Sequence, residues 1–143
     1  MGINSKNIFN KIYRINKAKK LLFNSIKYDP NSGRNYYCLA IWYMEMPKML
    51  GGNLQKAIKC YKKANSLESE VYIKMGLAKA LLKAGYFEEA KEILLEAVED
   101  VPTKSNVDTR RKFEAIALLM RIDPKFKLED RVMNECLPKS QNG

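Results

Sequence analysis

The sequence predicts an all-α protein, an α-solenoid of helical hairpins with a helical cap at each end. Three observations favour this fold class. Apolar residues make up 46% of the 143 residues, whereas Gly and Pro together number only 12, which leaves long stretches without helix breakers. A pattern of small and large residues recurs roughly every 30 to 40 residues along the chain, as expected of a helical repeat. Outside this repeat, apolar residues recur at helical spacing.

The repeat is a small–large–small pattern in which the two small residues lie seven positions apart. Such residues share one helix face, so a partner helix can approach closely while the large residue between them fills the gap. In the first and third copies a proline follows and ends the helix. The three copies are Ala18-x3-Leu22-x2-Ser25-x4-Pro30, Ala57-x3-Tyr61-x2-Ala64 and Ala90-x3-Leu94-x2-Ala97-x4-Pro102.

The residues before the third copy complete a hairpin. A first helix carries Leu77-Ala78-x2-Leu81, Gly85 supplies a tight turn, and a second helix starts near Phe87. This arrangement resembles the tetratricopeptide repeat at nearly every signature position. The resemblance implies stacked hairpins in which the first helix of each pair lines a concave surface.

The second copy also resembles this family, but its turn is five residues longer. The first helix is Tyr36-x2-Leu39-Ala40-x2-Tyr43, Pro47 ends it, and Gly51-Gly52 supplies a permissive backbone before the next helix. Together with Asp123-Pro124-x4-Glu129-Asp130-Arg131 near the C-terminus, this turn resembles the T component of tripartite solute transporters. That family implies an exported, oligomeric lipoprotein that partners a solute-binding protein, yet this chain is short and lacks the lipoprotein signal.

The chain ends differ from the hairpins. Ile8, Ile12, Ile15, Leu22 and Ile26 form one stripe, which predicts a long helix from about Ser5 to Tyr28. This helix is a cap, or else the sequence begins inside a longer protein. We expect a single domain over 1–137, made of this helix in 1–30, hairpins over 34–69 and 70–102, and capping helices over 107–137, followed by a disordered tail over 138–143.

The capping helices are predicted from two apolar patterns. Phe113, Ile116, Ala117 and Met120 recur at helical spacing and are expected to face the core. Leu128, Val132 and Cys136 predict a short amphipathic helix after it. The outer face of the first capping helix is expected to be solvated, as terminal repeats require, and to carry Arg110, Arg111, Lys112 and Arg121.

The resemblance assigns a partner-binding groove to the first helices of the two hairpins. Its positions are mostly apolar and aromatic with basic residues at the edges, which suits an amphipathic helix, a peptide or another copy of the chain. The alternative is that these positions belong to the core, or that the N-terminal helix fills the groove. The predicted groove residues are Arg34, Tyr37, Ile41, Met44, Tyr72, Met75, Lys79, Leu82 and Lys83.

Catalytic features are missing from the sequence. It has no His, no Gly-rich phosphate loop and no nucleophile with a recognisable base, so we expect neither an enzyme nor a metal or cofactor site. The neighbouring acids Glu88 and Glu89 fall in the first turn of a helix, where acids are favoured by the helix dipole. A non-enzymatic protein-interaction scaffold is therefore the first functional hypothesis, and an oligomeric transporter component is the second.

Charge is distributed unevenly. Residues 1–64 hold 13 Lys and Arg against 2 acids, whereas residues 65–143 hold 13 against 14. The basic half would attract nucleic acid or an acidic partner, so an electrostatic nucleic-acid binder is the third hypothesis. The alternative is the composition bias of an AT-rich genome.

Cysteine use and hydropathy bear on location. Three cysteines without a Cys-x-x-Cys pair are expected to be reduced structural thiols. No run approaches the roughly 20 apolar residues of a membrane span, and the first residues do not resemble a secretion signal. We expect a cytoplasmic protein, or a periplasmic one if an export signal precedes this sequence.

Overall fold

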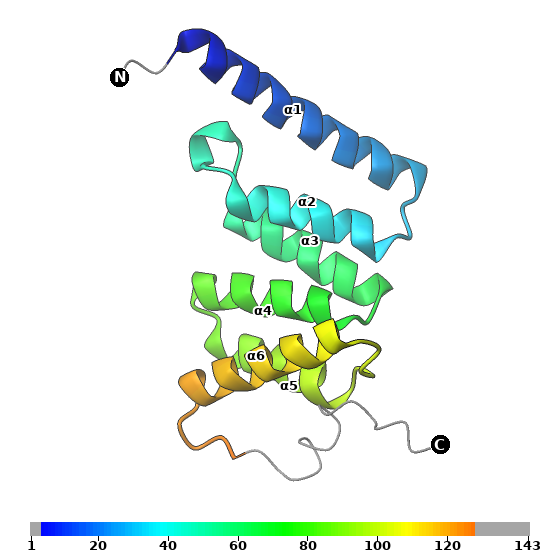
Figure 1. Ribbon diagram of the computed structural model, residues 1–143, viewed down its shortest axis with the longest axis vertical. Helices are drawn as coiled ribbons and strands as arrows, with labels where there is room; N and C mark the ends of the chain where they lie inside the picture. Colours follow the sequence, from blue (N-terminus) through cyan, green and yellow to red (C-terminus); the bar gives the residue numbers. More distant parts are fainter. Residues whose placement is uncertain (1–3, 128–143) are drawn as a thin grey trace. The chain divides into compact units, whose positions relative to one another are not determined.

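The computed structural model describes residues 4–127, and over this range the chain is all-helical, as predicted (Figure 1). The chain divides into two compact units, residues 1–67 and residues 68–143. The expected helix around Leu128, Val132 and Cys136 and the expected tail over 138–143 lie outside the described residues. The elements are α1 (Ser5–Tyr28), α2 (Gly33–Glu45), the 3-10 turn η1 (Lys48–Leu50), α3 (Leu54–Leu67), α4 (Val71–Ala84), α5 (Phe87–Glu99) and α6 (Asn106–Ile122).

In the first unit, α1 spans the range that its apolar stripe indicates. It begins after Asn4, whose side chain accepts a hydrogen bond from the Lys6 amide (3.2 Å). Most of the stripe is half-buried, although Ile8 at its start is 41% exposed. Helix α1 contacts α2, and Lys19 places its Nζ 4.8 Å from the centroid of the Trp42 ring. None of the 24 residues of α1 is buried. This long helix therefore uses only part of its surface within the unit.

Helices α2 and α3 form a hairpin joined by the long turn. Gly51 has a positive φ of 96°, and the Gly52 amide donates to the Pro47 carbonyl (3.0 Å). Asn53 then starts α3, because its amide donates to Tyr43 of α2 (2.9 Å) while its side chain accepts from the amide of Lys56 (2.9 Å). The buried apolar residues of this hairpin are Leu39, Ala40, Trp42, Tyr43, Ala57, Ile58, Tyr61 and Ala64.

The second unit is a three-helix arrangement in which α6 packs against both α4 and α5. Gly85 ends α4 in the left-handed conformation (φ 85°), and the Tyr86 amide reaches back to the Leu81 carbonyl (2.9 Å). The three helices and the connection between α5 and α6 enclose one apolar core. Its buried members are Val71, Met75, Ala78, Leu94, Val98, Val101, Ala115, Ile116 and Leu119.

The packing face of α6 differs from the prediction. Ile116 is buried as expected, but Phe113, Ala117 and Met120 are exposed. The face that meets the core is formed instead by Lys112, Ala115, Ile116 and Leu119. The prediction placed Lys112 on the solvated side because lysine is rarely buried, and this assignment rotated the expected face around the helix.

Lys112 tolerates burial because it finds backbone acceptors. Its side chain is only 1% exposed, and its Nζ donates to the carbonyl oxygens of Val98 (3.1 Å) and Val101. These carbonyls lie at and just beyond the C-terminal end of α5, where the helix dipole favours a positive charge. The Lys112 ammonium therefore links α6 to the C-terminal end of α5 through hydrogen bonds.

The loop after α6 is tied to α5 by an ion pair that predicts a pH dependence. Asp123 accepts from Lys91 Nζ (2.5 Å) and from the Lys125 amide (3.0 Å), and these contacts lower the pKa of Asp123. A lowered pKa contributes stability above the unfolded value of about 4, and this contribution is lost as the pH falls through the folded value. We expect the variant Asp123→Asn to lose less stability than the wild type below about pH 4 in urea titrations. Parallel losses would show that the pair does not contribute.

Among residues 4–127, no helix has both the length and the apolar composition needed to cross a lipid bilayer.

Candidate interaction surface

Two of the four predicted groove residues of α2, Tyr37 and Met44, contact α3 of the same hairpin. Arg34 is exposed, whereas Tyr37, Ile41 and Met44 are half-buried. The Tyr37 ring meets the Tyr61 ring of α3 edge-on, with centroids 5.8 Å apart.

Tyr61, the large residue of the second repeat copy, links two of these positions. Its hydroxyl donates to the Met44 sulfur (3.9 Å), and its ring contacts Tyr37. Burial, followed by the neighbouring Tyr37 and Glu45, raises the pKa of Tyr61, which keeps the hydroxyl protonated as a donor. Tyr37 and Met44 therefore both contact the buried Tyr61 within the hairpin.

Met75 of α4 was expected in the groove, and this assignment is wrong. Its side chain is 4% exposed and belongs to the core of the second unit. The physical reason is that α6 packs against α4 and covers it. Periodicity within α4 could not indicate this contact, because the partner face lies more than 30 residues later in the chain.

Of the other predicted groove residues of α4, Tyr72, Lys79 and Leu82 lie beside residues of α6. The Arg111 guanidinium lies 5.7 Å from the Tyr72 ring, and Lys79 Nζ pairs with Glu114 Oε1 (2.7 Å). Lys83 is exposed and Leu82 is half-buried. We call this strip of α4 and α6 the α4–α6 surface, defined by Tyr72, Lys79, Leu82, Lys83, Arg111, Glu114, Leu118 and Arg121.

A depression of about 600 Å³ lies at one end of the α4–α6 surface. Leu82 from the end of α4, Phe87 from the start of α5 and Leu118 from α6 contribute apolar side chains to it, and Phe87 is 55% exposed. The lining also contains two residues of opposite charge, Glu88 and Arg121. The full lining is Leu82, Phe87, Glu88, Leu118, Arg121 and Ile122.

Of the residues that line this depression, only Leu82 was among the predicted groove residues. Phe87 and Leu118 were missed because Phe87 marks the start of a helix and Leu118 falls outside the predicted apolar pattern. A signal was present in the spacing of Ala115, Leu119 and Ile122. Taken as the packing face of α6, that spacing would have placed Leu118 beside α4.

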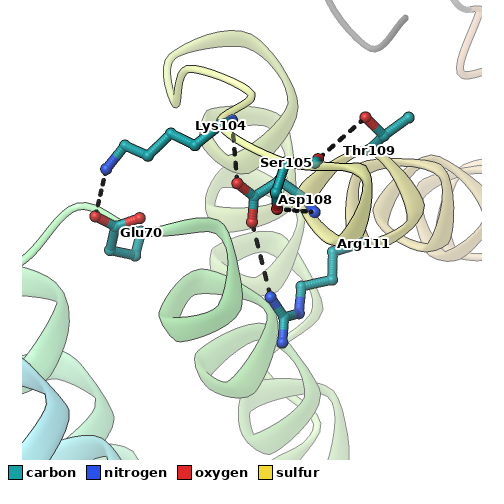
Figure 2. Close-up of polar contacts among 6 residues, drawn as sticks. All are labelled: Glu70, Lys104, Ser105, Asp108, Thr109 and Arg111. Atoms are coloured by element: carbon teal, nitrogen blue, oxygen red, sulfur yellow. Dashed lines mark hydrogen bonds and ion pairs between the residues drawn. The ribbon is translucent and has the colours of Figure 1, made fainter. Parts of the chain in front are cut away.

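The opposite end of the α4–α6 surface is held by a polar network, which Figure 2 shows. The Asp108 carboxylate accepts from the Lys104 amide (3.1 Å) and pairs with Arg111 (3.7 Å), while Lys104 Nζ donates to Glu70 Oε1 (2.6 Å). The Ser105 hydroxyl accepts from the Asp108 amide (3.2 Å) and caps α6.

This network connects the residue before α4 with the first turn of α6. The hydrogen bond to Glu70 is the main reason that the pKa of Lys104 is raised. Asp108 also directs Arg111, whose guanidinium lies by the Tyr72 ring. The network therefore sets how α6 lies along α4, and with it the shape of the α4–α6 surface.

Residues that could hold metals or perform thiol chemistry are few. Within residues 4–127, no group of three or more His, Cys, Asp and Glu side chains is placed to hold a metal ion. Cys38 and Cys60 are free and half-buried, and burial raises the pKa of the Cys60 thiol. A raised pKa lowers the thiolate fraction at neutral pH. No protein-family model matches the chain, and no curated protein matches its sequence.

Proposed function

We propose that this protein is a non-enzymatic interaction module that binds an apolar segment of a protein partner, a peptide or a helix, on the α4–α6 surface. The observation that carries this proposal is the depression lined by Leu82, Phe87 and Leu118. A recess of this size accepts one or two large side chains of a partner, and its apolar lining residues would contact them, which is how short peptides and helices gain affinity. We further propose that the hairpins are tetratricopeptide-like, on the strength of the repeated small–large–small pattern.

The charges around the depression indicate how a partner would be oriented. Glu88 and Arg121 belong to the lining and are exposed, and the exposed Lys83 follows the lining residue Leu82 in the sequence. Rim charges contribute little affinity in water but select the direction and the sequence of a bound segment. An apolar anchor flanked by an acidic residue is therefore the segment that we expect this surface to prefer.

A display experiment tests this function. A library of helical peptides would be selected against the intact chain, and the enriched peptides would be measured against Leu82→Arg, which fills the depression with a charge. We expect affinity to fall at least about tenfold, because an apolar anchor cannot share the recess with a guanidinium. Melting temperature, followed by circular dichroism, should change by only a few degrees because Leu82 is half-buried.

Asn106→Arg is the matched control for this experiment. Asn106 is exposed at the start of α6 and does not line the depression, so the same charge is added away from the recess. The proposed surface is contradicted if every enriched peptide binds Leu82→Arg as tightly as it binds Asn106→Arg.

The same samples separate the two alternatives. A transporter-type oligomeric component must self-associate without peptide, which light scattering measures directly. A nucleic-acid binder must bind a labelled oligonucleotide at about 50 mM salt and lose that affinity steeply as salt is added.

A further inference from the structure

Helix α1 has a second face that no other residue within 4–67 covers. Arg14, Ala18, Leu21, Ser25 and Tyr28 recur at spacings of four and three, so they form one stripe along the helix. All five are exposed, including Leu21 at 56% and Tyr28 at 94%. We call this stripe the open face of α1.

The open face ends beside a recess. A depression of about 590 Å³ is lined there by Leu21, Ser25 and Tyr28 of α1, together with residues at the turn into α2. Large apolar side chains at the edge of a recess are a common feature of surfaces that receive another protein. Asp29 and Ser32 of the turn and Asn35 of α2 also line this depression.

The other two repeat copies show what normally covers this pattern. In the second copy Ala57, Tyr61 and Ala64 of α3 are buried, and α3 pairs with α2. In the third copy Ala90, Leu94 and Ala97 of α5 are buried, and α5 pairs with α4. In each case the covering helix is the first helix of the hairpin that carries the pattern. These covering helices have 13 residues in α2 and 14 residues in α4.

The first copy has the pattern but not the cover. Ala18 and Ser25 are exposed and Leu22 is half-buried. Helix α1 is thus built like the second helix of a hairpin whose first helix is missing from the described residues. The small side chains leave room for a helix to approach closely, so a helix is the element that fits the open face.

The charge of α1 indicates which kind of helix would bind to its open face. Helix α1 carries seven basic residues and no acid, and residues 1–67 hold 13 basic residues against 2 acids. Arg14 lies in the open face, and Lys11 and Lys17 lie on either side of it. A second copy of the chain would bring two such sets of seven cations together, which is unfavourable, whereas an acidic helix would complement them.

We propose that the open face of α1 docks an acidic amphipathic helix of a partner protein. The apolar side of that helix meets Ala18, Leu21 and Tyr28, and its carboxylates lie near Lys11, Arg14 and Lys17. This site is separate in its residues and in its partner chemistry from the α4–α6 surface.

The test uses two synthetic helical peptides and the full chain. Both peptides carry the Tyr-x2-Leu-Ala-x2-Tyr pattern of α2 on one side, and they carry either glutamates or lysines on the other. Fluorescence anisotropy should show binding of the glutamate peptide and no binding of the lysine peptide at about 50 mM salt. Ala18→Glu should weaken the glutamate peptide at least about tenfold relative to Asn16→Glu.

Asn16→Glu is the matched control because Asn16 is exposed on α1 but lies outside the open face. Both variants change the charge equally, so their difference measures contact at the face rather than attraction at a distance. Circular dichroism confirms that both remain folded. Leu82→Arg should leave binding of the glutamate peptide unchanged, which keeps this test independent of the α4–α6 surface.

Four results would overturn the proposal. Equal weakening by Ala18→Glu and Asn16→Glu would leave only nonspecific attraction, and loss of binding in Leu82→Arg would move the site elsewhere. A dimer in light scattering that Ala18→Glu abolishes would assign the face to a second copy. Binding of poly(U) or of phosphatidylglycerol vesicles that depends on Ala18, without binding of the glutamate peptide, would assign it to another class of partner.

Discussion

Replacing Gly52 with alanine is expected to destabilise the first unit by at least about 3 kcal/mol. A Cβ at this position would overlap the carbonyl oxygen of Met46, would lie 2.5 Å from the Met46 carbonyl carbon, and would lie 3.0 Å from the Pro47 carbonyl oxygen. These atoms belong to the backbone and cannot rotate away as a side chain could. The turn must therefore open, at the expense of the hydrogen bonds that start α3.

Urea unfolding followed by tryptophan fluorescence measures this effect, because Trp42 is the single tryptophan and lies in the first unit. The matched control is Gly85→Ala in the second unit. Gly85 has a φ of +85°, but a Cβ there meets nothing within 4 Å, so only the left-handed backbone is penalised, by about 1–2 kcal/mol. A Gly52→Ala variant as stable as the Gly85→Ala variant would contradict the turn geometry.

Replacing Lys112 with methionine is expected to destabilise the second unit by about 3 kcal/mol. Methionine keeps the length of the buried stem and removes the ammonium, which leaves the carbonyls of Val98 and Val101 without this donor. Buried acceptors that lose a charged donor forfeit strong hydrogen bonds and cannot regain water. Thermal and urea unfolding followed by far-ultraviolet circular dichroism measure the change.

The control for this substitution is Lys79→Met on the exposed α4–α6 surface. Lys79 and Glu114 form an ion pair at 2.7 Å, but both side chains are nearly half exposed (46% and 48%). Exposed pairs of this kind contribute about 0.5 kcal/mol or less. If the Lys112→Met variant has the same free energy of unfolding as the Lys79→Met variant, water must reach the carbonyls at the end of α5.

Local signals in the sequence were sufficient for the helices. Helix α1 follows from one apolar stripe, and the turns follow from Pro47, Gly51-Gly52 and Gly85, because these residues limit or extend backbone freedom in a way that neighbours rarely override. The buried alanines at 57, 64, 90 and 97 also follow, because only small residues allow helices within a hairpin to approach so closely.

The predicted groove depended on contacts that the sequence does not display. Met75 was assigned to it from its position in α4, whereas α6 covers it. The orientation of α6 depends in turn on Lys112, a residue that hydropathy assigns to solvent but that two backbone carbonyls hold in the core. The depression beside Leu82 arises from that orientation, so it could not be inferred from α4 alone.

The two units, which meet between residues 67 and 68 of the chain, differ in how their basic side chains are neutralised. The second half supplies its own counter-charges through carboxylates such as Glu96 and Asp123, each bonded to a lysine. The first half has too few carboxylates to do so and must attract small anions from the surrounding salt. If a macromolecular anion binds the first half, it releases these small anions into solution. The entropy that the released anions gain adds to the binding affinity at low salt.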